Sequence, residues 1–160
     1  MPANLIDVVA YILKHYPIQS ELSNFRVTKM IYLSDWLSAR RYERQITEIK
    51  WFYDNFGPFV WDIKDTVEKN EGLIKVEHTK NTYGDDKLLF ILKDKNYKSA
   101  MTKEDTDMLD YVIDATKKLY SADFVNLVYS TYPILTSEKY TYLDLVGKAK
   151  EYKELKNKSV

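Results

Sequence analysis

The segment from Asn24 to about Arg44 constrains the fold of this 160-residue chain most, because it is long and apolar on more than one side. Its large apolar residues are Val27, Met30, Ile31, Leu33, Trp36 and Leu37. A surface helix carries a single apolar stripe, whereas a helix that is apolar around much of its circumference packs against several neighbours. We therefore expect a central helix at 24–44, with the rest of the chain folded around it.

Apolar residues at helical spacing predict further helices on both sides of this segment. At residues 4–16, Asn4 can cap the free amides and Pro17 cannot continue the hydrogen-bond ladder. Thr102 followed by Asp105 resembles a capping box that opens another helix. The remaining expected helices run from Pro58 in a first turn to Gly72 at the C′ position, from Ser121 onward, and over about 141–157, with a loop at 131–141.

Two runs rich in β-branched and apolar residues, at 73–79 and 87–93, predict an antiparallel hairpin in the middle of the chain. Gly84 lies between them and can supply the positive φ of the turn. A shorter extended piece ends at Gly57. The expected fold is therefore a predominantly helical α+β domain with a small antiparallel sheet inserted mid-chain. No linker or repeat divides the sequence, so we expect residues 1–160 to form a single domain.

The absence of cysteine excludes disulfide frameworks, zinc ribbons, iron–sulfur clusters and thiol catalysis, and makes the cytoplasm the expected compartment. The 24 basic residues balance the 24 acidic ones, which argues against broad electrostatic binding to nucleic acid or anionic lipid. The first residues lack the basic lead-in of a signal peptide, and no apolar run approaches the roughly 18 residues of a membrane span. We expect a protein that is neither exported nor embedded in a membrane.

The residue types needed for catalysis are scarce. His15 and His78 lack the spacing of a metal site or of a serine triad, and the four dispersed glycines cannot form a phosphate-binding loop. The acidic residues from Glu104 to Asp114 lack the glycine and distal glutamate of a calcium loop, and they suit a helix N-terminus. We expect no catalytic residue, no metal and no cofactor.

Asp35 is the carboxylate with the most unusual surroundings, because it lies in the apolar part of the central helix beside Trp36. A buried carboxylate must be paired, so we expect an ion pair or a hydrogen bond that fixes helix packing, with Arg26, Lys29 or Arg40 as candidate partners. A small enzyme that uses Asp35, or the acidic run, stays open as an alternative.

Basic residues cluster at the end of the central helix and again near the C-terminus, where lysines alternate with Glu151 and Glu154. Cations at helix C-termini complement the helix dipole, so a solvated face is the favoured interpretation. Binding of nucleic acid through the lysine-rich C-terminal helix is the weaker alternative.

The segment 51–61, WFYDNFGPFVW, holds six large aromatic residues among eleven, around one Gly-Pro pair. Such side chains can anchor a loop onto the core. They can also remain exposed and bind a protein partner, because Trp and Tyr dominate interface hot spots. We expect a mixture, with half or more of them in the core.

Three parts of the sequence together resemble the Panacea domain, which is seen in bacterial and phage antitoxins. They are the pattern K-x-x-Y-x-x-D at 29–35, a tryptophan at 51, and G-P-x-V at 57–60. The resembling core runs from about residue 5 to 130. We expect the matching residues mainly to define the fold, and they are Lys29, Tyr32, Asp35, Trp51, Gly57, Pro58 and Val60.

The resemblance implies a mainly helical, non-enzymatic protein that binds and neutralises a toxin encoded by an adjacent gene. The expected mechanism is occlusion of the toxin, with delivery of the toxin to a protease as the alternative and a nucleic-acid-binding regulator as the weaker one. Candidate contacts are the exposed aromatics, since these offer large contact area at low entropic cost. The candidates are Trp51, Phe52, Tyr53, Phe56, Phe59, Trp61, Tyr83, Tyr132 and Tyr140.

Overall fold

The computed structural model describes residues 2–158, and within that range the chain forms seven α-helices and two small antiparallel sheets. Residues 1 and 159–160, at the two ends of the expected single domain, lie outside the described residues. This mostly helical α+β architecture is the predicted one. The helices are α1 (Leu5–His15), α2 (Asn24–Tyr42), α3 (Asp62–Glu68), α4 (Lys103–Thr116), α5 (Ser121–Tyr129), α6 (Tyr132–Leu135) and α7 (Leu145–Lys158), and the strands are β1 (Phe52–Asp54), β2 (Gly57–Phe59), β3 (Ile74–Lys80) and β4 (Asp86–Leu92).

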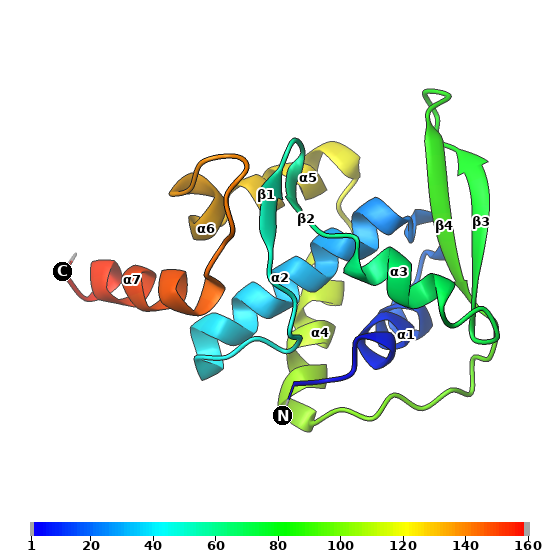
Figure 1. Ribbon diagram of the computed structural model, residues 1–160, viewed down its shortest axis with the longest axis horizontal. Coiled ribbons are helices and arrows are strands. Elements are labelled where there is room, and N and C mark those ends of the chain that lie inside the picture. Colours follow the sequence, from blue (N-terminus) through cyan, green and yellow to red (C-terminus); the bar gives the residue numbers. More distant parts are fainter. Residues whose placement is uncertain (1, 159–160) are drawn as a thin grey trace.

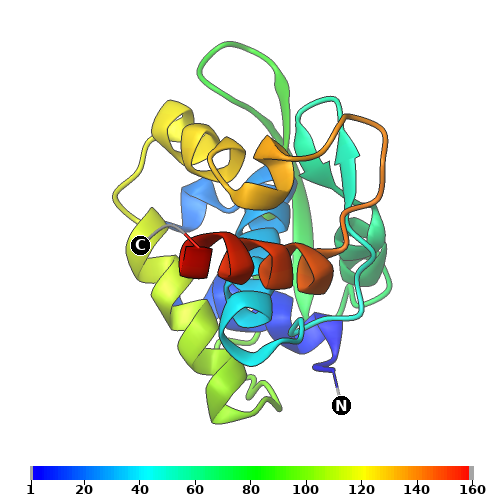
Figure 2. The same ribbon diagram turned by 90° about the vertical axis from the view of Figure 1, so that its left-hand side faces the viewer.

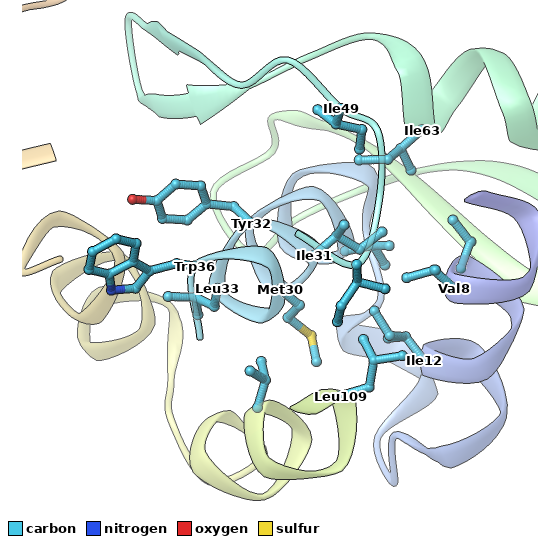
Figure 3. Packing of buried hydrophobic residues seen from close by; sticks show 14 of the residues in the cluster. Val8, Ile12, Met30, Ile31, Tyr32, Leu33, Trp36, Ile49, Ile63 and Leu109 are labelled. Atoms are coloured by element: carbon cyan, nitrogen blue, oxygen red, sulfur yellow. The ribbon is translucent and has the colours of Figure 1, made fainter. Parts of the chain in front are cut away.

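Helix α2 is the centre of the molecule, as its sequence predicts. It packs against α1, α3, α4 and α7 and against strands β2 and β4. Figure 3 shows Val8 of α1, Ile63 of α3 and Leu109 of α4 pointing toward side chains of α2. Because neighbours cover α2 on several sides, most of its polar residues are buried with its apolar ones, and each buried polar group needs a hydrogen-bond partner.

The β1–β2 hairpin lies over the middle of α2 (Figure 1). Phe52 pairs with Phe59 across the two strands. The chain segment 140–143, which leads into α7, runs along the other edge of β1, where its backbone bonds to residues 51–53 and Tyr142 bridges to Phe52. Figure 2 shows this segment, in orange, beside the hairpin. β1 is thus held on both edges.

The second hairpin, β3–β4, projects from the helices at one end of the molecule (Figure 1). Its strands match the predicted runs to within one residue, with Ile74 opposite Leu92. Gly84 has a φ of +83° in the turn, as expected. The prediction of the main hairpin is therefore confirmed.

Capping by side chains sets several helix starts. Asn4 accepts a hydrogen bond from the amide of Ile6 at the start of α1, and Thr102 accepts one from the amide of Asp105 at the start of α4. These caps confirm the predicted starts of α1 and α4. The carboxylate of Asp105 binds Arg44 instead of closing the capping box.

The prediction that Pro58 opens a helix is wrong. Pro58 lies in β2 opposite Tyr53, and the helix begins four residues later at Asp62. Proline fixes φ but suits an edge strand as well as a first helical turn, because neither position uses its missing N–H. Pro58 lies in a strand here because Gly57, the residue before it, has a φ of +97°. This backbone conformation turns the chain back along β1.

Three further boundaries differ from the sequence-based expectation. Helix α3 ends at Glu68, so Gly72 follows it after a turn and does not close it. The expected loop at 131–141 contains the short helix α6, and α7 begins at Leu145 where we expected about residue 141, because residues 140–143 pair with β1 instead. Pairing with a distant strand leaves no local signal in the sequence. Among the described residues, no helix has the length and apolarity that crossing a bilayer requires.

Candidate functional site

Asp35 is fully buried in α2, and five donors from the segment that follows the helix surround its carboxylate. Its Oδ1 accepts the amides of Ile46 at 2.9 Å and Thr47 at 3.0 Å. Its Oδ2 accepts the Thr47 hydroxyl at 2.6 Å, the Trp51 indole at 2.9 Å and the Gln45 amide at 3.3 Å. Burial raises the pKa of Asp35 to about 6, while the bonds from Thr47 and Trp51 oppose that rise. The carboxylate therefore ties residues 45–51 to α2.

The expectation that hydrogen bonds pair the buried Asp35 is confirmed, but the expected basic partners are wrong, since none of the ion pairs among the described residues involves Asp35. Arg26 instead reaches α4, where it donates to the carbonyl of Thr116 at 2.8 Å. Arg40 lies over the ring of Tyr152 at 4.8 Å. Both arginines leave α2 on faces other than that of Asp35, and dipolar donors compensate its charge.

Lys29 anchors strand β2, which follows residues 45–51 and β1 in the chain. It is 2% exposed, and its Nζ donates to the carbonyl of Pro58 at 3.0 Å. The ammonium also lies 4.3 Å from the ring centroid of Phe25 and 5.3 Å from that of Phe59. Burial lowers the pKa of Lys29 to about 8, against the attraction of Asp54. Lys29 thus holds β2 against α2.

Tyr32 lies between these two anchors on α2. Its ring meets Trp51 edge-on, with centroids 5.5 Å apart and planes at 81°. Its hydroxyl lies 2.8 Å from the hydroxyl of Thr131, beside α6. Burial raises the pKa of Tyr32 well above its usual value, so the hydroxyl stays neutral. This one side chain links the segment after α2 to the late helices.

The buried motif, which we define as Lys29, Tyr32, Asp35, Trp51, Gly57 and Pro58, is therefore one connected framework. The side-chain hydrogen bonds of Lys29, Tyr32 and Asp35 each join α2 to another segment of the chain. Val60, the remaining matching position, is half-buried against the core. The framework fixes where the β1–β2 hairpin sits and which of its faces points outward.

The backbone alternates between inside and outside along residues 48–54. Ile49, Trp51 and Tyr53 are buried, with exposed fractions of 5%, 0% and 9%. Trp51 and Tyr53 are thus core residues, which corrects their selection as candidate contacts. The residues that point the other way are Glu48, Lys50, Phe52 and Asp54. A period of two is the strand signature, and counted from Trp51 it would have separated Phe52 from Trp51 and Tyr53 by sequence alone.

An aromatic face lies on the outward side of this hairpin, and we define it as Phe52, Phe59, Trp61 and Tyr142. The rings form two T-shaped pairs: Phe52 with Tyr142 at 5.2 Å, and Phe59 with Trp61 at 5.1 Å. Trp61 is 60% exposed and Tyr142 is 74% exposed. The face borders an open concavity of about 630 Å³ whose charged lining residues are Glu48, Lys50, Asp54 and Asp62.

The other candidate contacts are distributed over three places. Phe56, 72% exposed, and Tyr140, whose hydroxyl donates to Asn55, lie at the turn of the β1–β2 hairpin, where Phe56 lines another concavity together with Phe25 and Lys87. Tyr83 is 90% exposed at the tip of the other hairpin. Tyr132 is half-buried on α6, with its ring 5.2 Å from that of Tyr152. The structure does not bring Tyr83 or Tyr132 to the aromatic face.

Sequence reasoning missed Tyr142 and the charged residues around the concavity. Alternation in 48–54 would have marked Glu48 and Asp54 as outward neighbours of Phe52. Tyr142 has no such signal, because its place beside Phe52 follows from long-range pairing.

The residues considered for catalysis are dispersed or paired. His15 and His78 are exposed on α1 and β3. The acidic residues of α4 bind partners on the protein, among them Arg44, which meets Glu104 and Asp105 at 3.0 Å each. Within the described residues no group of three or more His, Cys, Asp or Glu side chains could hold a metal ion.

The structure is thus a mostly helical domain in which buried hydrogen bonds hold a hairpin that carries an aromatic face. A family model described as the antitoxin SocA-like Panacea domain matches residues 27–133, which include the whole buried motif. The chain belongs to this family. Its membership supports an antitoxin role and a non-enzymatic regulator as the general class. Searches among curated proteins and among solved structures each gave no match.

Proposed function

We propose that this protein is an antitoxin that binds its cognate toxin directly in the cytoplasm and covers the toxin's active site or substrate entrance. The toxin would be the product of an adjacent gene. The observation that carries this proposal is the aromatic face, which stands exposed on a hairpin that the buried motif holds rigidly to α2. Rigid exposed aromatics supply large contact area at low entropic cost.

The proposed contact surface extends beyond the concavity. A stable complex buries on the order of 1,000 Å² or more in total, which exceeds what a single concavity provides. Phe56 and Tyr140, at the turn of the same hairpin, are both more than half exposed, and we propose them as further contacts.

The test uses the purified protein and the purified product of the adjacent gene, without any protease. We expect a stable complex and loss of toxic activity. Replacing Trp61 and Tyr142 by Ala weakens the complex, while Tyr120→Ala, at a 79% exposed tyrosine before α5, leaves it unchanged. If the intact protein binds the toxin and leaves its activity untouched, occlusion is wrong.

A protease adaptor is the second candidate, and one observation favours it. A second concavity of about 460 Å³ lies among α2, α4, α5, α6 and α7, is lined by Trp36, Leu37, Tyr132 and Leu135 among others, and shares no lining residue with the first. An adaptor needs two such separate surfaces, one for the toxin and one for the protease. Toxin that stays active with the protein alone and is degraded only when protease is added would favour this candidate.

A further inference from the structure

The concavity beside the aromatic face has a lining whose chemistry favours a cation. Its walls include the two aromatic pairs of Phe52 with Tyr142 and Phe59 with Trp61. Its charged lining residues are three carboxylates and one ammonium, those of Glu48, Asp54, Asp62 and Lys50. Aromatic faces attract cations through the ring quadrupole, and the excess of carboxylates adds a negative potential.

Backbone geometry brings these groups together. Glu48, Lys50, Phe52 and Asp54 alternate with buried residues and so share the outward side of one extended segment. Phe59 stands opposite Phe52 in the sheet, and Trp61 follows Phe59 by two residues. Because the buried motif fixes the hairpin on α2, the arrangement exists before any partner binds.

The carboxylates at the concavity are available to a ligand. Among the described residues, the side-chain carboxylates of Glu48 and Asp62 have neither a hydrogen-bond nor an ion-pair partner. The only bond to the Asp54 side chain comes from the amide of Asn55 at 2.9 Å. In the part of the chain that the structure describes, none of these three carboxylates is therefore held in an ion pair by a lysine or arginine of the protein.

The same aromatic rings already attract lysines from the protein itself. On the inner side of the hairpin, the buried Nζ of Lys29 lies 5.3 Å from the ring centroid of Phe59, and the charge of Asp54 favours its protonated form. On the surface, Nζ of Lys64 lies 5.6 Å from the ring of Trp61. Phe59, Trp61 and Asp54 are thus placed to interact with positive charge.

We propose that this concavity binds an arginine side chain of the toxin, so the inference rests on the proposed function and adds the chemistry of the contact. A guanidinium is planar and weakly hydrated, so it stacks on an aromatic ring while its N–H groups bond to carboxylates. Trp61 and Phe59 would supply the stacking surface, and Glu48 and Asp62 the carboxylates. An apolar side chain would leave those carboxylates desolvated and unpaired.

The first experiment tests the concavity without the toxin. The probe is N-acetyl-arginine methylamide, and the matched control is the citrulline analogue, which keeps the shape and removes the charge. The readout is the indole N–H resonance of Trp61 in an NMR titration, assigned with Trp61→Phe; the other two tryptophans, Trp36 and Trp51, are at most 6% exposed. We expect saturable shifts for arginine with at least about fivefold weaker binding of citrulline, a ratio typical of a cation–π contact. Equal shifts for both probes, or none for arginine, overturn the inference.

The second experiment changes the charges in opposite directions. The double variant Glu48→Gln, Asp62→Asn should bind the probe and the purified toxin about tenfold more weakly, and its binding should depend less on salt. Lys50→Gln should bind both more tightly. Thermal unfolding checks that each variant folds. A structural effect would weaken binding in all variants, so the opposite sign for Lys50→Gln is the decisive result. Variants that bind both ligands as the intact protein does overturn the inference.

These outcomes separate the inference from the proposed function. If the toxin binds tightly and the charge variants have no effect, the antitoxin proposal stands and the arginine contact is wrong. If no toxin complex forms and the arginine probe still binds selectively, the concavity recognises arginine and the antitoxin proposal fails. If a lysine probe, N-acetyl-lysine methylamide, binds more tightly than arginine, the assignment to arginine is overturned.

Discussion

The indole N–H of Trp51 donates to Oδ2 of Asp35 at 2.9 Å, and this bond joins two residues that are sixteen positions apart. Both side chains are fully buried. The bond explains why an aspartate and a tryptophan occur together in the motif: each satisfies a polar group that burial would otherwise leave unpaired. Their role is to hold the segment that presents the aromatic face.

Replacing Asp35 with Asn should destabilise the protein by about 1–3 kcal/mol, the cost of a buried polar group left without its partner. The amide nitrogen of Asn is only a donor, so in the place of Oδ2 it accepts neither from the Trp51 indole nor from the other donors there. Urea unfolding at neutral pH measures the loss. The exposed Glu71→Gln, the same change of carboxylate to amide, is the control and should leave the midpoint unchanged.

A normal unfolding midpoint for Asp35→Asn would contradict the bonding pattern described for the carboxylate. The same variant also tests the alternative of an enzyme that uses Asp35. In that case biological activity would be lost while stability stayed intact.

Lys29 should make stability depend on pH in the alkaline range. Its pKa falls from 10.5 in the unfolded chain to about 8 in the folded protein. Between these values the unfolded chain holds more protons, so the free energy of unfolding rises with pH. We expect Lys29→Met to remove a gain of about 2 kcal/mol between pH 7.5 and 9.5.

The measurement compares urea unfolding of the intact protein and of Lys29→Met at these two pH values. The upper limit stays below 10, because folding raises the pKa of Tyr16 to about 12 and so reduces stability where tyrosines of the unfolded chain ionise. Parallel pH profiles for the two proteins would mean that Lys29 titrates normally.

Gly57 should not tolerate a side chain, for a reason of conformation rather than space. Its φ is +97°, while an added Cβ would meet its nearest neighbour, the ring of Tyr129, at an ordinary 3.7 Å. We expect Gly57→Ala to cost roughly 1–3 kcal/mol from backbone strain. Thermal or urea unfolding gives the value.

Gly72 provides the matched control, since nothing lies within 4 Å of an added Cβ and its φ is not positive. Gly72→Ala should be neutral or stabilising by up to about 1 kcal/mol through the unfolded chain. Equal losses for both variants would show that the turn at Gly57 does not depend on its φ.

The sequence predicts the fold well where local signals decide and poorly where distant segments pair. Caps at Asn4 and Thr102 and the turn at Gly84 are local, and the structure confirms them. The strand at Pro58 depends on pairing with β1 and on Lys29, which reaches its carbonyl from α2. A proline next to a glycine carries no local mark that separates that outcome from a helix start.

In the candidate site, too, the features with local signals could be predicted and those that depend on distant segments could not. Family resemblance identifies the buried motif, yet it does not tell which aromatics face outward. Alternation separates Trp51 from Phe52, whereas the partner of Phe52, Tyr142, is ninety positions away and joins the face only through the pairing of residues 140–143 with β1. The part of the site that depends on tertiary contacts could therefore not be predicted from the sequence.

The two tryptophans of the hairpin segment should behave in opposite ways when replaced. Trp51→Phe keeps most of the apolar volume but removes the indole donor, so we expect a loss of stability of about 1–3 kcal/mol. Trp61→Ala, at a 60% exposed position, should leave stability within about 0.5 kcal/mol and weaken the toxin complex at least tenfold. Urea unfolding measures the first effect, and titration calorimetry with the purified product of the adjacent gene measures the second. Tight toxin binding by a folded Trp61→Ala variant would place the contact surface elsewhere, whereas a Trp61→Ala variant that unfolds easily would mean that this ring belongs to the framework of the hairpin.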